Sequence, residues 1–247
     1  MGTRESAQKE PVPVFFAWAI HSLTASGAVL AFLALLAVEQ GQLRLALLWL
    51  GAALVVDGID GPLARWAGVA RLTPGIDGAT LDLVVDYLTY VFVPAILIYR
   101  AGLLPEPYAP AAVAAILLSS LYTFARTDMK TVDNFFRGFP ALWNVIAFYL
   151  FMLQPGQLTA AIIVGVFVGL TFAPITFVHP LRVRLYQPWL AALTALWGLC
   201  SFALLWPGWS PPWMQAWLAL SLAGAGALLL IGLLRTFRGP RLDKTPI

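Results

Sequence analysis

Four aspartates stand at helical spacing within two neighbouring apolar stretches of the chain. Asp57 and Asp60 are three residues apart, and Asp82 and Asp86 are four apart, so each pair lies on one face of its own helix. Carboxylates at membrane depth cost about 2.5–3.5 kcal/mol each and usually mark a functional site. We expect the two pairs to face each other. Because four such groups would repel one another, they should then bind cations between them.

The ligand chemistry favours a hard divalent cation and a phosphate-containing substrate. Oxygen ligands suit Mg²⁺, Mn²⁺ or Ca²⁺ rather than zinc, and Mg²⁺ or Mn²⁺ usually bridges carboxylates to phosphate oxygens. Arg65, close to the first pair, has the forked donor geometry that matches phosphate. We therefore expect a diphosphate substrate, one or two metal ions, and a spare aspartate that accepts a proton from the attacking oxygen.

Composition places these residues in a membrane protein. The 247 residues are 60% hydrophobic and 11% charged, with a mean hydropathy of +0.82, whereas a soluble domain has about 25% charged residues. We predict an all-α, polytopic membrane bundle with a polar lead at 1–14, one catalytic bundle at 15–235 containing the motif at 57–86, and a basic tail at 236–247. Apolar runs of suitable length predict eight spans, at roughly 15–38, 43–66, 79–100, 108–125, 139–154, 158–178, 188–206 and 213–235.

Basic residues predict the orientation of these spans. With the N-terminus inside, all of the 15 Lys and Arg residues except Arg44 and Arg100 fall in cytoplasmic segments. This bias predicts that both termini are cytoplasmic and that the site faces the cytoplasm. The lone Cys200 excludes an intrachain disulfide, and a net charge of +3 without a basic block indicates no nucleic-acid partner.

The second span must include its aspartates. The apolar run at 45–56 would be only roughly 18 Å long as a helix, which is too short for a hydrocarbon core of about 30 Å. Gly58, Gly61 and Ala64 then recur at intervals of three and leave room for a backbone or a flat ligand, while Pro62 should kink or loosen this turn.

The third span should place its aspartates at a similar depth. Pro74 and Gly75 predict a turn, and the span begins near Gly78, so its aspartates lie in its first two turns. The cytoplasmic end of the first span carries a polar patch at His21, Ser22 and Thr24. These side chains either form ordinary interhelical hydrogen bonds or line the aspartate site.

The sequence DGIDGPLAR at 57–65, followed by Gly78 and the second aspartate pair, resembles the signature of the CDP-alcohol phosphotransferases. These integral membrane enzymes displace CMP from a CDP-linked substrate with an alcohol. The resemblance implies that the metal ligands are Asp57, Asp60 and Asp82, and that Asp86 is the general base and also touches metal.

The same resemblance implies a nucleotide site. Gly61 and Ala64 would let the nucleotide approach, and Arg65 would hold phosphate in the catalytic centre. We also place Thr24 among the nucleotide-binding residues. Gly78 lies thirteen positions after Arg65, a longer gap than in the common family motif, so the geometry of 66–77 is left open.

Further segments resemble the bacterial phosphatidylcholine synthase branch of that family. They are this longer gap, the GP after Asp60, TYVFVP at 89–94 and FRGFPALWN at 136–144. The resemblance implies transfer of a phosphatidyl group from CDP-diacylglycerol to choline in the bacterial inner membrane. It also implies Mn²⁺ or Mg²⁺, with two ions per site, and a homodimer surrounded by membrane lipids.

Choline sets its own chemical demand. A quaternary ammonium has no N–H donor, so its recognition relies on aromatic faces; the candidates are Tyr87, Tyr90, Tyr122, Trp143 and Tyr149. Arg126 and Arg137, in the long inner loop, are candidates for lipid phosphate. Most aromatic residues of a membrane protein instead serve in interfacial belts or packing.

Three alternatives stay open at this point. The aspartates could form structural ion pairs, although only Arg65 and Arg71 lie in the same stretch. A sibling enzyme could use another alcohol, such as inositol, serine or glycerol phosphate. An ion-coupled transporter could also carry intramembrane carboxylates, but it would leave the pattern of Gly61, Ala64 and Arg65 unexplained.

Overall fold

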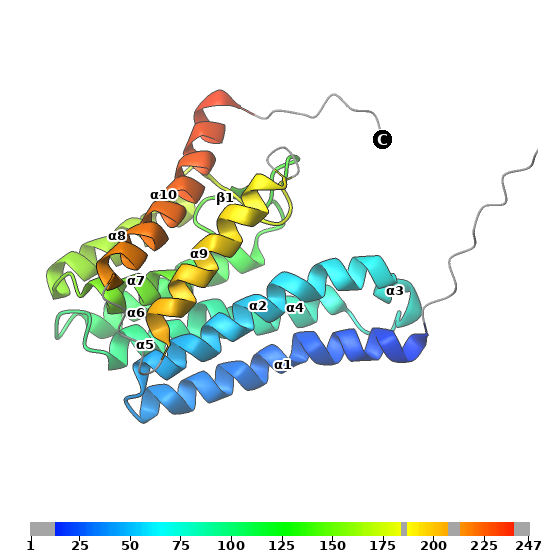
Figure 1. Ribbon diagram of the computed structural model, residues 1–247, viewed down its shortest axis with the longest axis horizontal. Helices are drawn as coiled ribbons and strands as arrows, with labels where there is room; N and C mark the ends of the chain where they lie inside the picture. Colours follow the sequence, from blue (N-terminus) through cyan, green and yellow to red (C-terminus); the bar gives the residue numbers. More distant parts are fainter. Residues whose placement is uncertain (1–12, 184–186, 207–212, 240–247) are drawn as a thin grey trace, which may run out of the picture.

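The computed structural model describes residues 13–183, 187–206 and 213–239, and in that part the chain is mainly helical (Figure 1). Most of the predicted polar lead (1–14) and of the basic tail (236–247) lies outside the described residues. The elements, in chain order, are α1 (Val14–Glu39), α2 (Leu43–Ala67), α3 (Val69–Leu72), α4 (Gly78–Asp86), the π-helix η1 (Tyr87–Phe92), α5 (Val93–Arg100), α6 (Ala109–Ala125), β1 (Phe136–Arg137), α7 (Trp143–Leu153), α8 (Gln157–Phe172), β2 (Thr176–Phe177), α9 (Trp189–Leu205) and α10 (Met214–Arg238).

Several helical stretches have the length and apolarity of membrane spans. Val14–Glu39, Gly78–Arg100 and Met214–Arg238 are long enough to cross a bilayer, and α6, α7, α8 and α9 are shorter apolar helices. The 25-residue α2 carries more charge, including both members of the first aspartate pair. These helices agree with the predicted membrane bundle.

The prediction of an all-helical chain omits a small sheet. β1 and β2 pair antiparallel, with Phe136 opposite Phe177 and Arg137 opposite Thr176. As a result, the span predicted at 158–178 is helical only to Phe172, and the span predicted at 139–154 becomes helical only at Trp143. Pro174 accounts for the first limit, because a residue before proline avoids helical backbone. Ala141, with a positive φ of 58°, accounts for the second, because it keeps the chain out of the right-handed helical conformation just before α7.

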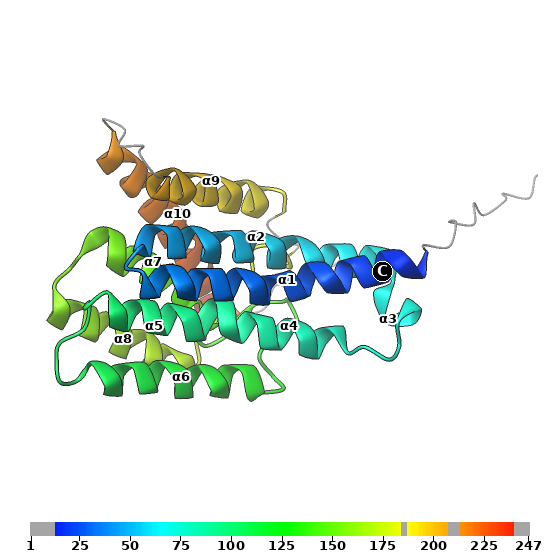
Figure 2. The ribbon, with the colours of Figure 1, turned by 90° about the horizontal axis from the view of Figure 1, so that it is seen from below.

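The longest helices lie side by side in layers. Figure 2 shows α6, then α4 and α5, then α1, then α2, and finally α9 from one side of the molecule to the other, and each neighbouring pair is in contact. α1 and α4 approach closely, since a β-carbon at Gly27 would lie 2.5 Å from Val85 Cγ1. This close packing holds the start of the third span against the first.

α2 continues without a break through both of its aspartates, as predicted. Pro62 lies inside the helix, which ends with Gly68 in the left-handed conformation at φ 65°. The predicted turn at Pro74–Gly75 is present, but the short helix α3 before it was not foreseen.

Polar contacts then anchor the segment between α2 and α4. Asp77 caps α4 by accepting hydrogen bonds from the Ala79 and Thr80 amides at 3.0 and 3.2 Å. His21 Nε2 lies 2.9 Å from the Thr73 hydroxyl and joins this segment to α1. The long gap in the motif is therefore an ordered connection.

A buried polar network joins α7, α9 and α10. The Tyr149 hydroxyl lies 2.8 Å from Ser221 Oγ and accepts a hydrogen bond from Trp197 Nε1 at 2.8 Å. Ser201 Oγ is 2.9 Å from the same serine, whose side chain is fully buried. Tyr149 therefore has a structural role in this network.

The sheet also depends on close contact with α10. The Thr176 hydroxyl donates to the Gly232 carbonyl at 2.9 Å, and the Thr176 amide donates to Thr236 Oγ1 at 2.8 Å. A β-carbon at Gly232 would clash with the carbonyl oxygen of Thr176. The absence of a side chain at this position lets α10 approach β2.

We predict that Gly232→Ala destabilises the protein by about 1–3 kcal/mol, because the added methyl pushes α10 away from β2. The measurement is thermal unfolding in detergent. Gly226→Ala in the same helix is the matched control, since nothing lies within 4 Å of its β-carbon position. Equal unfolding temperatures for the two variants would contradict the prediction.

Candidate metal centre

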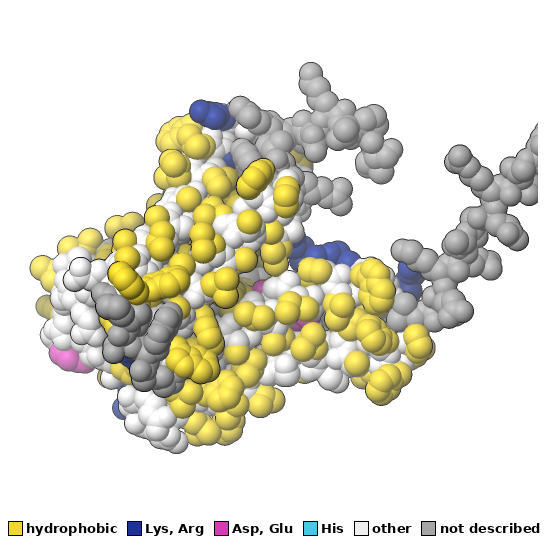
Figure 3. Space-filling model, viewed as in Figure 1, with side chains coloured by type: hydrophobic (Ala, Val, Ile, Leu, Met, Phe, Trp, Pro, Cys, Tyr) yellow, Lys and Arg dark blue, Asp and Glu magenta, His cyan; other side chains and the backbone are white. Residues whose placement is uncertain are grey.

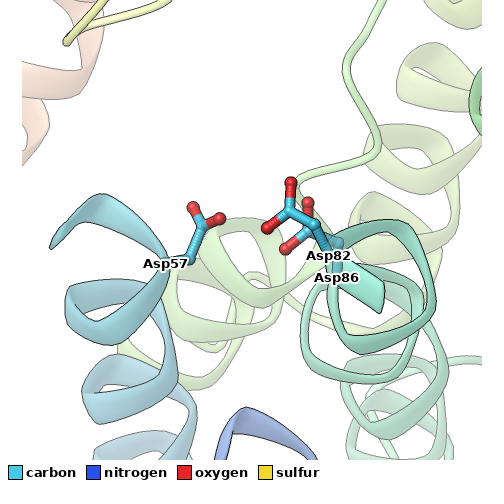
Figure 4. A group of neighbouring side chains, drawn as sticks. All are labelled: Asp57, Asp82 and Asp86. Atoms are coloured by element: carbon cyan, nitrogen blue, oxygen red, sulfur yellow. The ribbon is translucent and has the colours of Figure 1, made fainter. Parts of the chain in front are cut away.

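Three carboxylates from two helices meet at one place. Asp57 of α2 and Asp82 and Asp86 of α4 each offer an oxygen, and these oxygens all lie within 4.8 Å of one another (Figure 4). Each of the three residues is partly buried. This group, which we call the aspartate site, has the donor atoms and spacing that a divalent cation requires. The expectation that the second and third spans face each other through their aspartates is confirmed for these three residues.

Asp60 lies outside that group, although it is its close neighbour. Its side chain is only 3% exposed, and it lies beside Thr24 of α1. It remains within electrostatic reach of Asp57 and Asp82. The structure therefore divides the four predicted ligands into a group of three and an adjacent buried carboxylate, with Thr24 next to the latter.

Tyr90 supports the aspartate site directly. Its hydroxyl donates a hydrogen bond of 2.5 Å to Asp57 Oδ2, while its ring is almost completely buried. Tyr90 follows Asp86 by four residues, on the π-helical segment η1. Such segments are rare and frequently occur at functional sites. The geometry makes Tyr90 a residue that orients a carboxylate.

The remaining motif residues lie along the last turns of α2. A β-carbon at Gly61 would lie 3.3 Å from the guanidinium of Arg65, so the glycine leaves room for that side chain. Arg65 is within electrostatic reach of Asp60 and Asp82. Ala64 packs against the small apolar cluster where α1 meets the end of α2. The nucleotide contacts of these three residues stay predictions.

The other aromatic candidates have different surroundings. Trp143 is fully buried and donates from Nε1 to Ser120 Oγ at 2.8 Å. The Tyr87 hydroxyl donates to the Leu117 carbonyl at 3.4 Å, and its ring packs edge-on against Phe124. Tyr122 is 46% exposed and lies under the guanidinium of Arg126. Their predicted contacts with choline are not tested by these positions.

The two arginines proposed for lipid phosphate lie in the loop after α6. Arg126 pairs with Asp128 at 2.7 Å and also donates to the backbone carbonyl of Arg137 at 3.2 Å. The side chain of Arg137 is exposed. Their role toward lipid phosphate stays a prediction.

Sequence reasoning missed two basic residues near the aspartates. Lys130 and Arg182 are both within electrostatic reach of Asp82, yet the charge pattern had indicated only that their loops are cytoplasmic. More than fifty residues of sequence separate the two, so no local motif connects them.

Comparison with known proteins identifies the family. The sequence profile described as "CDP-alcohol phosphatidyltransferase" matches residues 18–197, which is more than half of the chain. The chain belongs to this family. The aspartate site therefore has the residues that could bind the divalent metal used by CDP-alcohol phosphatidyltransferases.

Several members of the CDP-alcohol phosphatidyltransferase family are similar over most of their length. A phosphatidylcholine synthase of Pseudomonas aeruginosa is 46% identical over 195 residues, covering 79% of this chain and 82% of that protein. One from Rhizobium meliloti is 42% identical, covering 84% and 86%. One from Agrobacterium fabrum is 40% identical over 231 residues, covering 93% and 95%.

We predict that Tyr90→Phe weakens Mn²⁺ binding by about tenfold, because a residue that orients a ligand typically contributes 10- to 100-fold to metal affinity. Isothermal titration of Mn²⁺ without substrates measures this directly. Tyr99→Phe is the control, since this residue lies near the C-terminal end of the same span and is 41% exposed. Wild-type Mn²⁺ affinity in folded Tyr90→Phe would show that the hydrogen bond does not position the site.

Proposed function

We propose that the protein transfers the phosphatidyl group from CDP-diacylglycerol to choline, giving phosphatidylcholine and CMP. The observation that carries this proposal is the meeting of three signature carboxylates within 4.8 Å in a chain of this family. The phosphatidylcholine synthases that match at 40–46% identity support choline as the alcohol. We refer to the chemistry below as the choline reaction.

In this proposal the aspartate site holds Mn²⁺ or Mg²⁺, with two ions per site. Asp57, Asp82 and Asp86 supply ligands, and the adjacent Asp60 completes the set. When bound, the metal neutralises the diphosphate and the leaving phosphate. Tyr90 keeps Asp57 turned toward the other carboxylates, so the ligands are arranged before substrate arrives.

Asp86 also has a proton to accept. The hydroxyl oxygen of choline bonds to the phosphorus of the phosphatidyl group, the bond from that phosphorus to the CMP oxygen breaks, and Asp86 takes the hydroxyl proton. Arg65 holds phosphate, and Gly61, Ala64 and Thr24 form the nucleotide side of the site. This assignment agrees with Arg65 being within electrostatic reach of Asp60 and Asp82.

Choline and the lipid would bind beside this centre. We keep the aromatic candidates for the quaternary ammonium, of which Tyr87 and Tyr122 expose part of their side chains, whereas Tyr90 and Trp143 are buried. Arg126 and Arg137 are our candidates for the lipid phosphate.

The same proposal covers the membrane arrangement. We propose eight spans in a single catalytic bundle at 15–235, with both termini cytoplasmic and the active site facing the cytoplasm from the bacterial inner membrane. The distribution of Lys and Arg between the loops supports this orientation. We also propose a homodimer, on family resemblance.

We predict that purified protein releases CMP from labelled CDP-diacylglycerol only when choline and Mn²⁺ are both present. Inositol, serine and glycerol phosphate, added in competition, should not replace choline. Loss of choline preference would indicate a sibling enzyme with another alcohol. No CMP release, together with ion flux in liposomes, would indicate a transporter.

We predict that Asp57→Asn and Asp82→Asn abolish metal-dependent turnover, because each removes a charged ligand. Asp86→Asn should lower turnover by about 10²–10⁴-fold, the usual contribution of a general base, while sparing part of the nucleotide binding. Steady-state CMP release and CDP binding measure the two effects. Glu106→Gln, in an exposed outer loop, is the control. Near-normal turnover of Asp86→Asn would remove its role as base.

A further inference from the structure

Basic side chains from three separate segments gather beside the aspartate site. Arg65 lies in the last turns of α2, Lys130 in the loop between α6 and β1, and Arg182 in the loop after β2. Arg182 is within electrostatic reach of both Arg65 and Lys130, and all three are within reach of Asp82. We call Arg65, Lys130 and Arg182 the basic cluster. Figure 3 shows basic side chains in the notch between the lobe of α9 and the end of α2, close to acidic side chains.

The two-stranded sheet assembles this cluster. Lys130 forms an isolated bridge with Phe136 of β1, and its ammonium lies 5.3 Å from the centre of the Phe136 ring. His179, just after β2, stacks on that ring at 5.1 Å. The two loops are thus held together through one aromatic side chain.

A contact with α2 places the sheet loops over the aspartates. A β-carbon at Gly58 would lie 3.6 Å from Leu181 Cδ1, so the residue before Arg182 rests on α2 directly after Asp57. Gly138, at φ 74°, lets the first loop pack against the end of α8, where a β-carbon would clash with the Thr171 carbonyl. The position of Arg182 therefore follows from the packing of the backbone around it.

The charges of the basic cluster have no ion-pair partner in the described part of the chain. Arg100, Arg126 and Arg235 each pair with a carboxylate at 2.7–3.0 Å, whereas no such pair is found for the three residues of the cluster. Burial, and then the neighbouring Arg182, lower the pKa of Lys130 below its ordinary value. Burial, followed by Lys130 and Arg182, lowers the pKa of His179 to about 3, so this imidazole stays neutral.

The charge balance indicates that an anionic ligand binds between the aspartate site and the basic cluster. Three cations held close together in a partly buried place repel one another. The nearby carboxylates can offset this repulsion only while no metal is bound to them. Cations at the aspartate site would neutralise the carboxylates, and the basic cluster would then lack negative charge nearby. A ligand that carries several negative oxygens would then restore the balance.

We propose that Lys130 and Arg182, together with Arg65, bind the diphosphate of the nucleotide-activated lipid beside the aspartate site. Arginine guanidinium groups match phosphate oxygens in pairs, and lysine adds a compact charge. This inference rests on the proposed function, since it assigns residues to the substrate of the choline reaction. The two loops would thereby bind the phosphates, and other residues would recognise the cytidine base.

The test compares soluble ligands that differ only in phosphate number. The full-length protein in non-ionic detergent with Mn²⁺ is titrated with CDP, CMP and cytidine. Lys130→Gln and Arg182→Gln should each weaken CDP binding by about tenfold, the size of one hydrogen bond to a charged group. In both variants the affinity for CMP should fall less than the affinity for CDP, and the affinity for cytidine should not fall. The KM for choline should not change.

Matched variants separate charge from folding. Lys130→Arg and Arg182→Lys keep the charge and should retain most of the affinity for CDP. Arg44→Gln, in the exposed first turn of α2, removes a cation of the same helix far along the chain from the aspartates and should bind CDP normally. Thermal unfolding shows whether each variant is folded.

Several results would overturn the inference. The first is that folded Lys130→Gln and Arg182→Gln bind CDP with an affinity within twofold of the wild type. The second is that these variants lose as much affinity for cytidine as for CDP. Loss confined to anionic lipid vesicles, with CDP binding intact, would assign the cluster to lipid headgroups and also overturn it. Failure of the choline reaction is a separate result, since the wild type would then bind CDP but release no choline-dependent CMP.

Discussion

The main physical constraint on this structure is the repulsion between carboxylates that are held close together in an apolar bundle. Oxygens of Asp57, Asp82 and Asp86 lie within 4.8 Å of one another on two packed helices, where water cannot fully screen their charges. Such an arrangement is stabilised when positive charge offsets the repulsion or when one of the carboxyl groups is protonated. The three residues could hold a divalent cation that offsets this repulsion, and Lys130 and Arg182 add positive charge within electrostatic reach of Asp82.

The scaffold around the carboxylates is adapted to hold them. Gly27 lets α1 pack closely on the start of the third span at Val85. The π-helical turn η1 carries Tyr90, whose hydroxyl fixes Asp57. His21 and Asp77 then secure the connection between the two aspartate helices. Each contact limits how far the carboxylates can separate when no cation lies between them.

The small sheet brings basic residues close to the aspartate site. It joins the loop after α6 to the loop after α8, and α10 packs on it through Gly232. Lys130 and Arg182 are thereby brought near the same aspartate. The aspartates and these neighbouring basic residues together are suited to a phosphate ligand with bound metal, in agreement with membership of the CDP-alcohol phosphatidyltransferase family.

The sequence by itself determined the helical membrane class, the continuation of α2 through its aspartates, and the family, because these depend on local spacing and composition. Only the tertiary structure decided that Asp60 lies apart beside Thr24, that Tyr90 supports Asp57, and that Lys130 and Arg182 approach the site. The physical reason is the range of the interactions. Helix periodicity acts over a few residues, whereas these contacts depend on strand pairing and helix packing between segments distant in the chain.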